Sequence, residues 1–209
     1  FTVGGDSIWA EAAKELGIKT VGYSPNTLGR LNEEQLKEVE KAYQQAVNDL
    51  GRKFLPLNTT AGQLVRRDYL QAKAGDAIFA IGQIVYPGQR NKQGYIVKSK
   101  IPSVDGGTGY AVQMAINMDK PVHIFDYTKN KWYVYDKNKK DFVEEQTPQL
   151  TPKFTGIGTR DVDGVDWVKN IVKNIYRITK DGVTENIKED EKDSISKPNN
   201  QKRLVLTAR

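Results

Sequence analysis

Two hydrophobic periods alternate along the chain. Short apolar runs rich in β-branched and aromatic residues are typical of buried strands, and apolar positions recurring at helical spacing are typical of the buried face of a helix. These patterns predict strands at 1–3, 19–23, 76–82, 121–125 and 154–157, and helices at 7–16, 33–50, 60–74, 108–118 and 164–179. Strands that alternate with helices favour a parallel sheet covered on both faces. The predicted fold class is therefore α/β with a mainly parallel sheet.

Polar and glycine residues mark where several of these helices begin and end. Asp6 or Ser7 can cap the first helix, because their side-chain oxygens accept from the unpaired N–H groups of a first turn. Asn32 with Gln35 forms a capping-box pattern, and Gly51 suits the left-handed residue that ends the same helix.

Two hairpins are predicted in addition to the strand and helix units. Residues 83–104 have strand-like ends at 84–86 and 95–97 around proline and glycine, which predicts an inserted hairpin or flap. Residues 131–143 predict a second, smaller hairpin around Asn138.

The chain changes character beyond residue 181. Residues 185–200 are charged and lack a sustained apolar period, which predicts a loose segment. The apolar patch at 204–206 is predicted either to add an edge strand or to contact a partner. We therefore predict one domain at 1–180, interrupted by the insertion, and a charged extension at 181–209. Because the chain begins inside a predicted strand, we expect it either to lack residues upstream or to be part of something longer.

Composition excludes several classes of protein and site. The chain has 209 residues, of which 38% are hydrophobic, enough for one full core. No apolar run of about 18 residues is present, so nothing predicts a membrane span. With no cysteine and one histidine, thiolate nucleophiles, thiolate metal sites and histidine clusters are excluded. We therefore expect no metal and no cofactor, and the lack of cysteine fits a reducing cytoplasm.

The distribution of charge is more informative than the net charge of +6. Residues 77–104 contain no Asp or Glu but carry four basic residues, Arg90, Lys92, Lys98 and Lys100. Positive potential there suits a phosphorylated ligand. The alternative is an exposed hairpin kept in solution by its lysines, and the sequence does not separate the two.

A glycine turn lies where this insertion ends. Asp105, Gly106, Gly107, Thr108 and Gly109 follow the insertion and open a predicted helix. Glycines let a phosphate approach the backbone, and the unpaired N–H groups of a helix start point at it. We predict that this turn forms the ligand site.

These residues resemble a known family. Arg67, followed by the strand at 76–82 and then by the turn at 106–109, is similar to the LOG ("Lonely Guy") proteins, once misnamed lysine decarboxylases, and to the wider SLOG superfamily. The start, Gly4-Gly5-Asp6-Ser7, is similar to the first glycine turn of SLOG proteins but is shorter than the usual G-G-A-x-G-A-D form. The runs at 104–115 and 154–160 resemble a subgroup encoded by phages and bacteria.

The resemblance implies a Rossmann-like, doubly wound sheet that binds a nucleotide or nucleotide-derived ligand. LOG enzymes cleave the N-glycosidic bond of nucleoside 5′-monophosphates with an arginine and a glutamate, and Arg67 and Gln113 fall on these positions. It also implies a homodimer. The predicted ligand and phosphate contacts are Gly4, Gly5, Asp6, Ser7, Arg67, Gly82, Asp105, Gly106, Gly107, Thr108, Gly109 and Arg160.

Gln113 separates the functional hypotheses. A carboxylate can stabilise the positive charge that develops on the ribose or activate water, whereas a neutral amide can only hydrogen-bond. We therefore favour a module that binds a nucleotide-derived ligand. An N-glycosidase remains the alternative, because Asp105, Asp6 or Glu11 could supply the carboxylate. A third hypothesis is a nucleic-acid-binding or virion-associated structural protein, based on the basic insertion.

Other candidate residues have simpler interpretations. Arg66 and Arg67 cannot share one helix face, so we expect one to meet the ligand and the other solvent or a carboxylate. Trp9 could stack on a base but equally suits the core. We interpret His123 as a structural residue held by hydrogen bonds, and Tyr135 as one of several aromatic residues in cross-strand pairs of the small hairpin.

Overall fold

The computed structural model describes the backbone of residues 5–193 and 204–208 and the side chains of residues 5–180. The predicted strand at 1–3 lies outside these residues. The main sheet contains β1 (Lys19–Tyr23), β2 (Ala77–Gly82), β5 (Val122–Asp126), β6 (Lys131–Asp136), β7 (Asp141–Glu145), β8 (Lys153–Gly158) and β9 (Leu204–Ala208). The helices are α1 (Gly5–Glu15), α2 (Glu33–Leu50), α3 (Thr60–Ala74), α4 (Thr108–Asn117) and α5 (Asp166–Asp193), with short 3₁₀ helices η1 (Pro25–Arg30) and η2 (Arg160–Val162).

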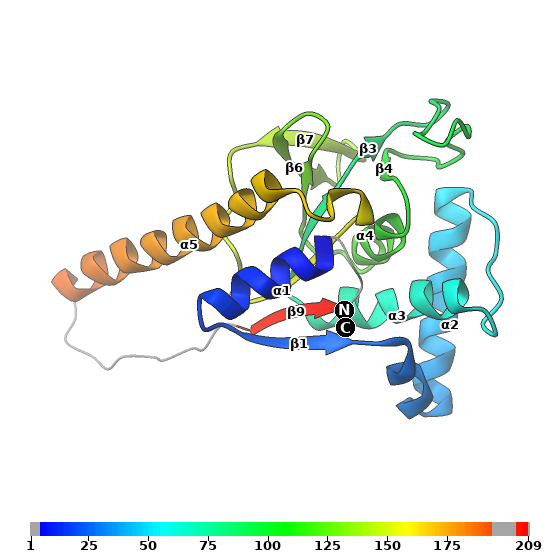
Figure 1. The fold of residues 1–209 in the computed structure, drawn as a ribbon, viewed down its shortest axis with the longest axis horizontal. Coiled ribbons are helices and arrows are strands. Elements are labelled where there is room, and N and C mark those ends of the chain that lie inside the picture. Colours follow the sequence, from blue (N-terminus) through cyan, green and yellow to red (C-terminus); the bar gives the residue numbers. More distant parts are fainter. Residues whose placement is uncertain (1–4, 194–203, 209) are drawn as a thin grey trace.

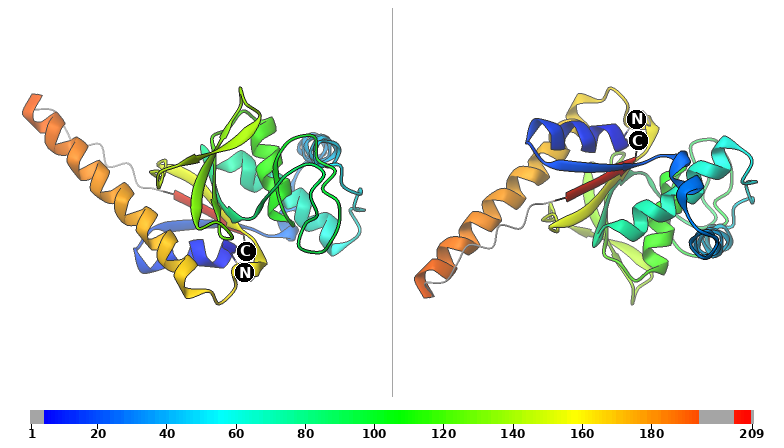
Figure 2. Two further views of the ribbon diagram at one scale, coloured as in Figure 1. Left: turned by 90° about the horizontal axis from the view of Figure 1, so that it is seen from above. Right: turned by 90° about the horizontal axis from the view of Figure 1, so that it is seen from below.

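The sheet has seven strands in the order β1-β9-β8-β2-β5-β6-β7. The first five are parallel, and β6 and β7 add an antiparallel hairpin at one edge. Helices α1 and α5 cover one face and α3 and α4 cover the other, with α2 packed against α3 and α4 (Figures 1 and 2). The predicted α/β class with a Rossmann-like, doubly wound arrangement is confirmed.

Strand β2 shows how the sheet separates two cores. All six of its residues are buried. Ile78 and Ala80 belong to the core formed with α2, α3 and α4, whereas Phe79 and Ile81 belong to the core formed with α1 and α5. Successive side chains of a strand point to opposite faces, so a strand covered on both sides is apolar throughout.

Local signals place most helix ends as predicted. Asn32 and Gln35 form the capping box of α2, and Gly51 ends that helix with φ of 60°. The prediction that Asp6 or Ser7 caps the first helix is wrong, because α1 already begins at Gly5. The Asp6 carboxylate instead accepts the N–H of Gly158 at the end of β8, at 2.8 Å.

The insertion at 83–104 is a flap, but its strands differ from those expected. Strand β3 (Ile84–Val85) pairs with β4 (Ser103–Val104) at the base of the flap. The predicted strand at 95–97 is reduced to one bridge, between Arg90 and Ile96. Gly88 and Gly94 have positive φ angles, 79° and 83°, which glycine adopts without strain at turns of the chain.

Two predictions about the end of the chain are wrong. Residues 185–193 of the predicted loose segment continue helix α5, since Glu and Lys favour helix without an apolar stripe. Residues 194–200 of that prediction lie outside the described residues. Strand β9 is not an edge strand, because it lies between β1 and β8 and pairs with both. The boundary between a domain at 1–180 and an extension at 181–209 stays a prediction. None of the described helices is long and apolar enough to cross a membrane.

Trp9 packs against a glycine of the sheet. Its ring is fully buried and its Nε1–H donates to the Ile157 carbonyl at 3.1 Å, so it is a core residue. A Cβ added to Gly156 would lie 2.5 Å from two atoms of the Trp9 ring. We expect Gly156→Ala to lower the free energy of unfolding by about 2 kcal/mol through overpacking.

Urea denaturation measures this loss. Gly29→Ala is the matched control, because a Cβ there would have no atom within 4 Å. Equal stability of the two variants would contradict the prediction, because it would show that the Trp9 ring can move to make room for a methyl group at position 156.

Candidate functional site

A cavity of about 430 Å³ lies at the carboxyl end of β8. Strand β5 lies on one side of β2, and β8, which follows β7 in the chain, lies on the other side. The strand order therefore reverses next to β2. Ligands of open α/β sheets bind at such a switch point, beyond the carboxyl ends of the strands. The cavity is lined by Asp6, Leu55, Ala61, Leu64, Val65, Arg67, Asp68, Gln71, Lys92, Gly106, Gly107, Thr108, Tyr110, Ala111, Ile157, Gly158, Thr159, Arg160 and Asp161.

An arginine and two acids form the inner wall of this cavity. Arg67 of α3 is 4% exposed, donates from Nη1 to the Tyr23 carbonyl at 3.2 Å, and pairs through Nη2 with Asp68 Oδ1 at 3.2 Å. Its Nε is buried and has no hydrogen-bond partner among the described residues. Asp6 and Asp68 are 6% and 7% exposed. A buried donor without a partner is costly, and a ligand atom in the cavity could satisfy it.

Burial changes the acidity of both carboxyl groups. It raises the pKa of Asp6 to about 6, against the opposing charge of Arg67 and the hydrogen bond from Gly158. It raises the pKa of Asp68 to about 7, where Arg67 again opposes it and Asp6 adds to it. The pair can therefore hold or exchange a proton near neutral pH.

The glycine turn forms the opposite wall. Gly106 has φ of 69°, and a Cβ on Gly106 or Gly107 would have no atom within 4 Å. Helix α4 begins at Thr108. Within the described part of the chain, no hydrogen bond uses the N–H groups of Gly106, Gly107 or Thr108. These amides, at a helix start facing open space, suit an anion.

Basic and acidic side chains meet at a third side of the cavity. Arg160, at the start of η2, is exposed, and Lys92 of the insertion forms an ion pair with Asp161. Burial alone would raise the pKa of Asp161, but hydrogen bonds from Lys92, Thr159 and Tyr127 outweigh it and hold the pKa below its usual value. The insertion thus contacts the cavity through Lys92.

No protein-family model, curated protein or solved structure matches this chain.

The structure brings together six of the residues predicted for ligand binding or catalysis. Those that line the cavity are Asp6, Arg67, Gly106, Gly107, Thr108 and Arg160. They come from α1, α3, the turn before α4, and η2, so the fold gathers segments that are distant in sequence.

The other predicted contacts do not line the cavity. Gly4 lies outside the described residues. Gly5, Gly82 and Gly109 serve close packing, because an added Cβ would lie 2.4 Å from Gly158 Cα, 2.5 Å from a Val104 methyl carbon and 2.1 Å from the Val104 carbonyl oxygen, respectively. Ser7 lies within α1.

Asp105 and Gln113 also lie away from the cavity lining. Asp105 Oδ1 accepts from Asn91 Nδ2 at 3.2 Å, and its Oδ2 is buried without a partner among the described residues. Gln113 donates to Asn117 Oδ1 at 3.0 Å and lines a separate cavity of about 630 Å³. The position that the resemblance assigns to the catalytic acid is therefore not part of the site described here.

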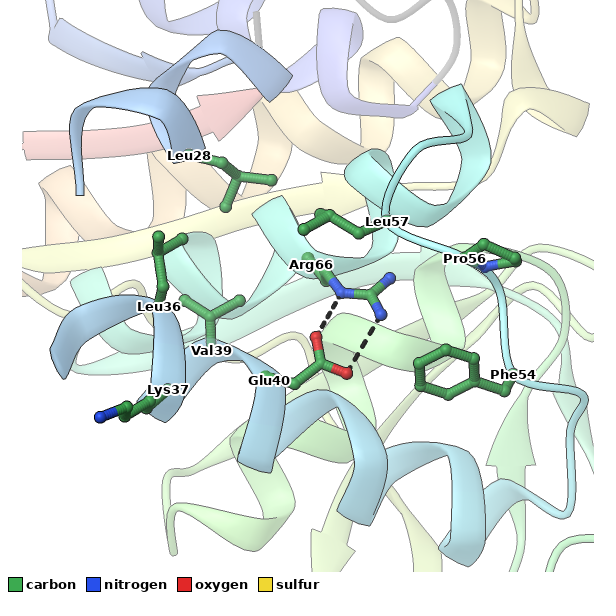
Figure 3. A pocket seen from close by; sticks show the side chains of 9 residues that line it. All are labelled: Leu28, Leu36, Lys37, Val39, Glu40, Phe54, Pro56, Leu57 and Arg66. Carbon is green, nitrogen blue, oxygen red and sulfur yellow. Dashed lines mark hydrogen bonds and ion pairs between the residues drawn. The ribbon is translucent and has the colours of Figure 1, made fainter. Parts of the chain in front are cut away.

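Arg66 has a different environment from its neighbour Arg67. Its guanidinium contacts both carboxylate oxygens of Glu40, at 2.6 and 3.1 Å (Figure 3). It also lies over the rings of Tyr43 and Phe54. This pair forms the floor of an apolar cavity of about 530 Å³. The expectation that one of the two arginines meets a carboxylate holds for Arg66.

Asp68 is the main residue that the sequence reasoning missed. The sequence does contain a signal for it: Asp68 directly follows Arg66 and Arg67 in the same predicted helix, where it could pair with one of them. The sequence predicts Lys92 only as part of the basic insertion, not as a residue of the site. His123, in contrast, contacts Glu145 Oε1 at 2.7 Å and stacks on Phe79, and Tyr135 packs edge-on against Phe142 across the hairpin, both as interpreted from the sequence.

Proposed function

We propose that the cavity at the end of β8 binds a phosphorylated, nucleotide-derived ligand. One observation carries the proposal: the glycine turn, with its free amides, and Arg67, whose buried Nε has no partner among the described residues, line the same 430 Å³ space. The N–H groups of a helix start and a guanidinium both bind phosphates. The family resemblance of Arg67 and the turn supports the same ligand class.

The distribution of charge supports an orientation for the ligand. The phosphate fits between the Gly107 and Thr108 amides and the basic side chains of Arg67, Arg160 and Lys92. The inner wall holds Asp6 and Asp68, which accept hydrogen bonds when ionised and repel a second phosphate. Sugar hydroxyls or the amino group of a base therefore suit the inner wall.

Hydrolysis of an N-glycosidic bond is the second candidate. It is favoured by the raised pKa values of Asp6 and Asp68, about 6 and about 7. A carboxyl group with a pKa near neutrality can give or take a proton at the pH of the cell. Asp6 or Asp68 could therefore act as the catalytic carboxyl group, a role that the neutral amide of Gln113 cannot fill.

A thermal-shift screen tests the proposal. Nucleoside monophosphates, ADP-ribose and cyclic nucleotides are compared with the matching nucleosides. A ligand at 100 times its dissociation constant should stabilise the fold by about 2.7 kcal/mol. Phosphorylated compounds should raise the melting temperature and nucleosides should not. Free base detected by chromatography after incubation would favour the hydrolase. No shift and no product with any of these compounds would contradict both candidates.

Arg160→Ala should weaken binding of the phosphorylated compound by about tenfold, because it removes an exposed cation from the phosphate side of the cavity. Isothermal titration calorimetry measures the change. Arg177→Ala is the control, since Arg177 is an exposed arginine of α5 that donates to Asn174. Equal losses in the two variants would indicate a nonspecific charge effect.

A further inference from the structure

Arg52 lies directly behind the glycine turn. It follows Gly51, the residue that ends α2. Its Nη1 donates to the Gly106 carbonyl at 2.6 Å and its Nη2 donates to the Val104 carbonyl at 2.9 Å. The guanidinium also lies over the Tyr110 ring, 4.8 Å from its centre. The two arms of one planar group therefore hold the backbone on both sides of Asp105.

These contacts determine where the Gly107 amide points. The C=O and N–H of a trans peptide point in opposite directions. Because the Gly106 carbonyl points at Arg52, the N–H of Gly107 in the same peptide points away from Arg52. Gly107 lines the cavity and Arg52 does not. The Val104–Asp105 peptide follows the same rule, since its carbonyl accepts from Arg52 and its N–H donates to the Gln83 carbonyl at 2.9 Å.

Arg52 packs closely against the first turn of α4. A Cβ on Gly109 would lie 2.8 Å from Nη2 of Arg52, so only glycine lets the guanidinium pack this closely against α4. Among the described residues Arg52 forms no salt bridge. Burial lowers the pKa of its guanidinium from the ordinary value, yet an arginine remains charged at neutral pH. A positive charge thus lies behind the helix start without a paired carboxylate.

We propose that Arg52 is a positioning residue for the anion of the ligand. It acts through the backbone: it fixes the Gly106–Gly107 peptide so that the Gly107 N–H is presented to a phosphate in the cavity. Its charge adds to the positive potential of the start of α4. This inference rests on the proposed function, because it assigns the orientation of one amide in the same phosphate site.

Three variants test the role of Arg52. Arg52→Gln removes the charge and one arm of the fork, Arg52→Lys keeps the charge without the fork, and Lys53→Gln removes the charge of an exposed neighbour as the control. The probes are AMP and GMP, measured by calorimetry and by the shift of the Gly107 amide in ¹H–¹⁵N spectra. Circular dichroism and thermal unfolding report whether each variant is folded.

We expect wild-type protein and Lys53→Gln to bind the better of the two monophosphates with affinities within about twofold of each other. Arg52→Gln should bind about tenfold more weakly, as expected for one lost hydrogen bond to a charged group, and Arg52→Lys should lie between. The Gly107 amide should shift on saturation in wild-type protein but not in Arg52→Gln.

Two contrary results differ in meaning. If Arg52→Gln binds as tightly as wild-type protein and its Gly107 amide still shifts, Arg52 has only a structural role and the inference is overturned, while the proposed site stands. If wild-type protein binds neither probe and no amide of the turn shifts, the proposed function fails for these nucleotides, and the role of Arg52 fails with it. If Arg52→Gln does not fold, the folded Arg52→Lys variant decides by the same two measurements.

Discussion

Asp68→Asn should stabilise the protein relative to the wild type, and this gain should grow by about 3 kcal/mol between pH 5 and pH 8. Burial raises the pKa of Asp68 from 3.8 to about 7. Between these two values the folded state binds more protons than the unfolded state, so wild-type stability falls as the pH rises through the folded pKa. Asparagine keeps the shape and hydrogen-bonding capacity of a neutral carboxyl group but cannot ionise.

Urea denaturation at pH 5, 6, 7 and 8 measures this effect. Asp163→Asn changes an exposed carboxylate outside the cavity and is the matched control. A pH-independent difference between Asp68→Asn and wild-type protein would mean that the buried carboxylate carries no ionisation cost, and the acid–base interpretation of the cavity would fail. Asp6→Asn should also gain stability over the wild type as the pH rises, but this gain should level off nearer pH 6, where the pKa of Asp6 in the folded state lies.

Arg67→Met should remove ligand binding and destabilise the fold at pH 8 by about 3 kcal/mol, because it leaves Asp6 and Asp68 buried without the cation between them. The loss of stability should be smaller at pH 5, where both carboxyl groups are mainly protonated in the folded state. Methionine keeps much of the side-chain volume, so the effect reports charge and hydrogen bonding more than a cavity.

A double variant separates the two roles of Arg67. Arg67→Met combined with Asp68→Asn should recover most of the lost stability, since one buried charge is removed along with its partner. Binding of a nucleoside monophosphate should remain at least about 100-fold weaker than in the wild type, because the phosphate side has lost its guanidinium. Arg30→Met, at an exposed arginine of η1, is the control. Recovery of binding in the double variant would show that Arg67 serves only to neutralise the acids.

The environments of Arg66 and Arg67 show why this prediction concerns the second arginine. Both side chains are nearly fully buried, but Arg66 has a carboxylate, two rings and two carbonyls as partners. Arg67 retains an unsatisfied nitrogen beside the cavity. Their spacing in the sequence predicted that Arg66 and Arg67 point in different directions. Only the packing of α2 and the 54–57 loop against α3 showed that Arg66 is the one held by structural contacts.

Local chemistry determined much of this protein from the sequence alone. The apolar run of β2, the capping box at Asn32 and the glycine stop at Gly51 depend on residues close in the chain, and each appears as predicted. The positive φ of Gly106 belongs to the same class, because glycine adopts it without strain. The direction of the Gly107 amide does not, since it depends on the contact of Arg52 with the Gly106 carbonyl. The parallel, doubly wound arrangement followed from the alternation of such elements.

Only the tertiary structure decided what these elements meet. Strand β9 enters the sheet between β1 and β8, a pairing that no local pattern specifies. Asp68 became a buried acid, and Gln113 lies in a different cavity from the turn, because the packing of helices on the sheet sets the direction of each side chain. Burial and charge pairing act through space, so the acidity and the partners of the site residues depend on segments up to 152 positions apart, such as Asp6 and Gly158.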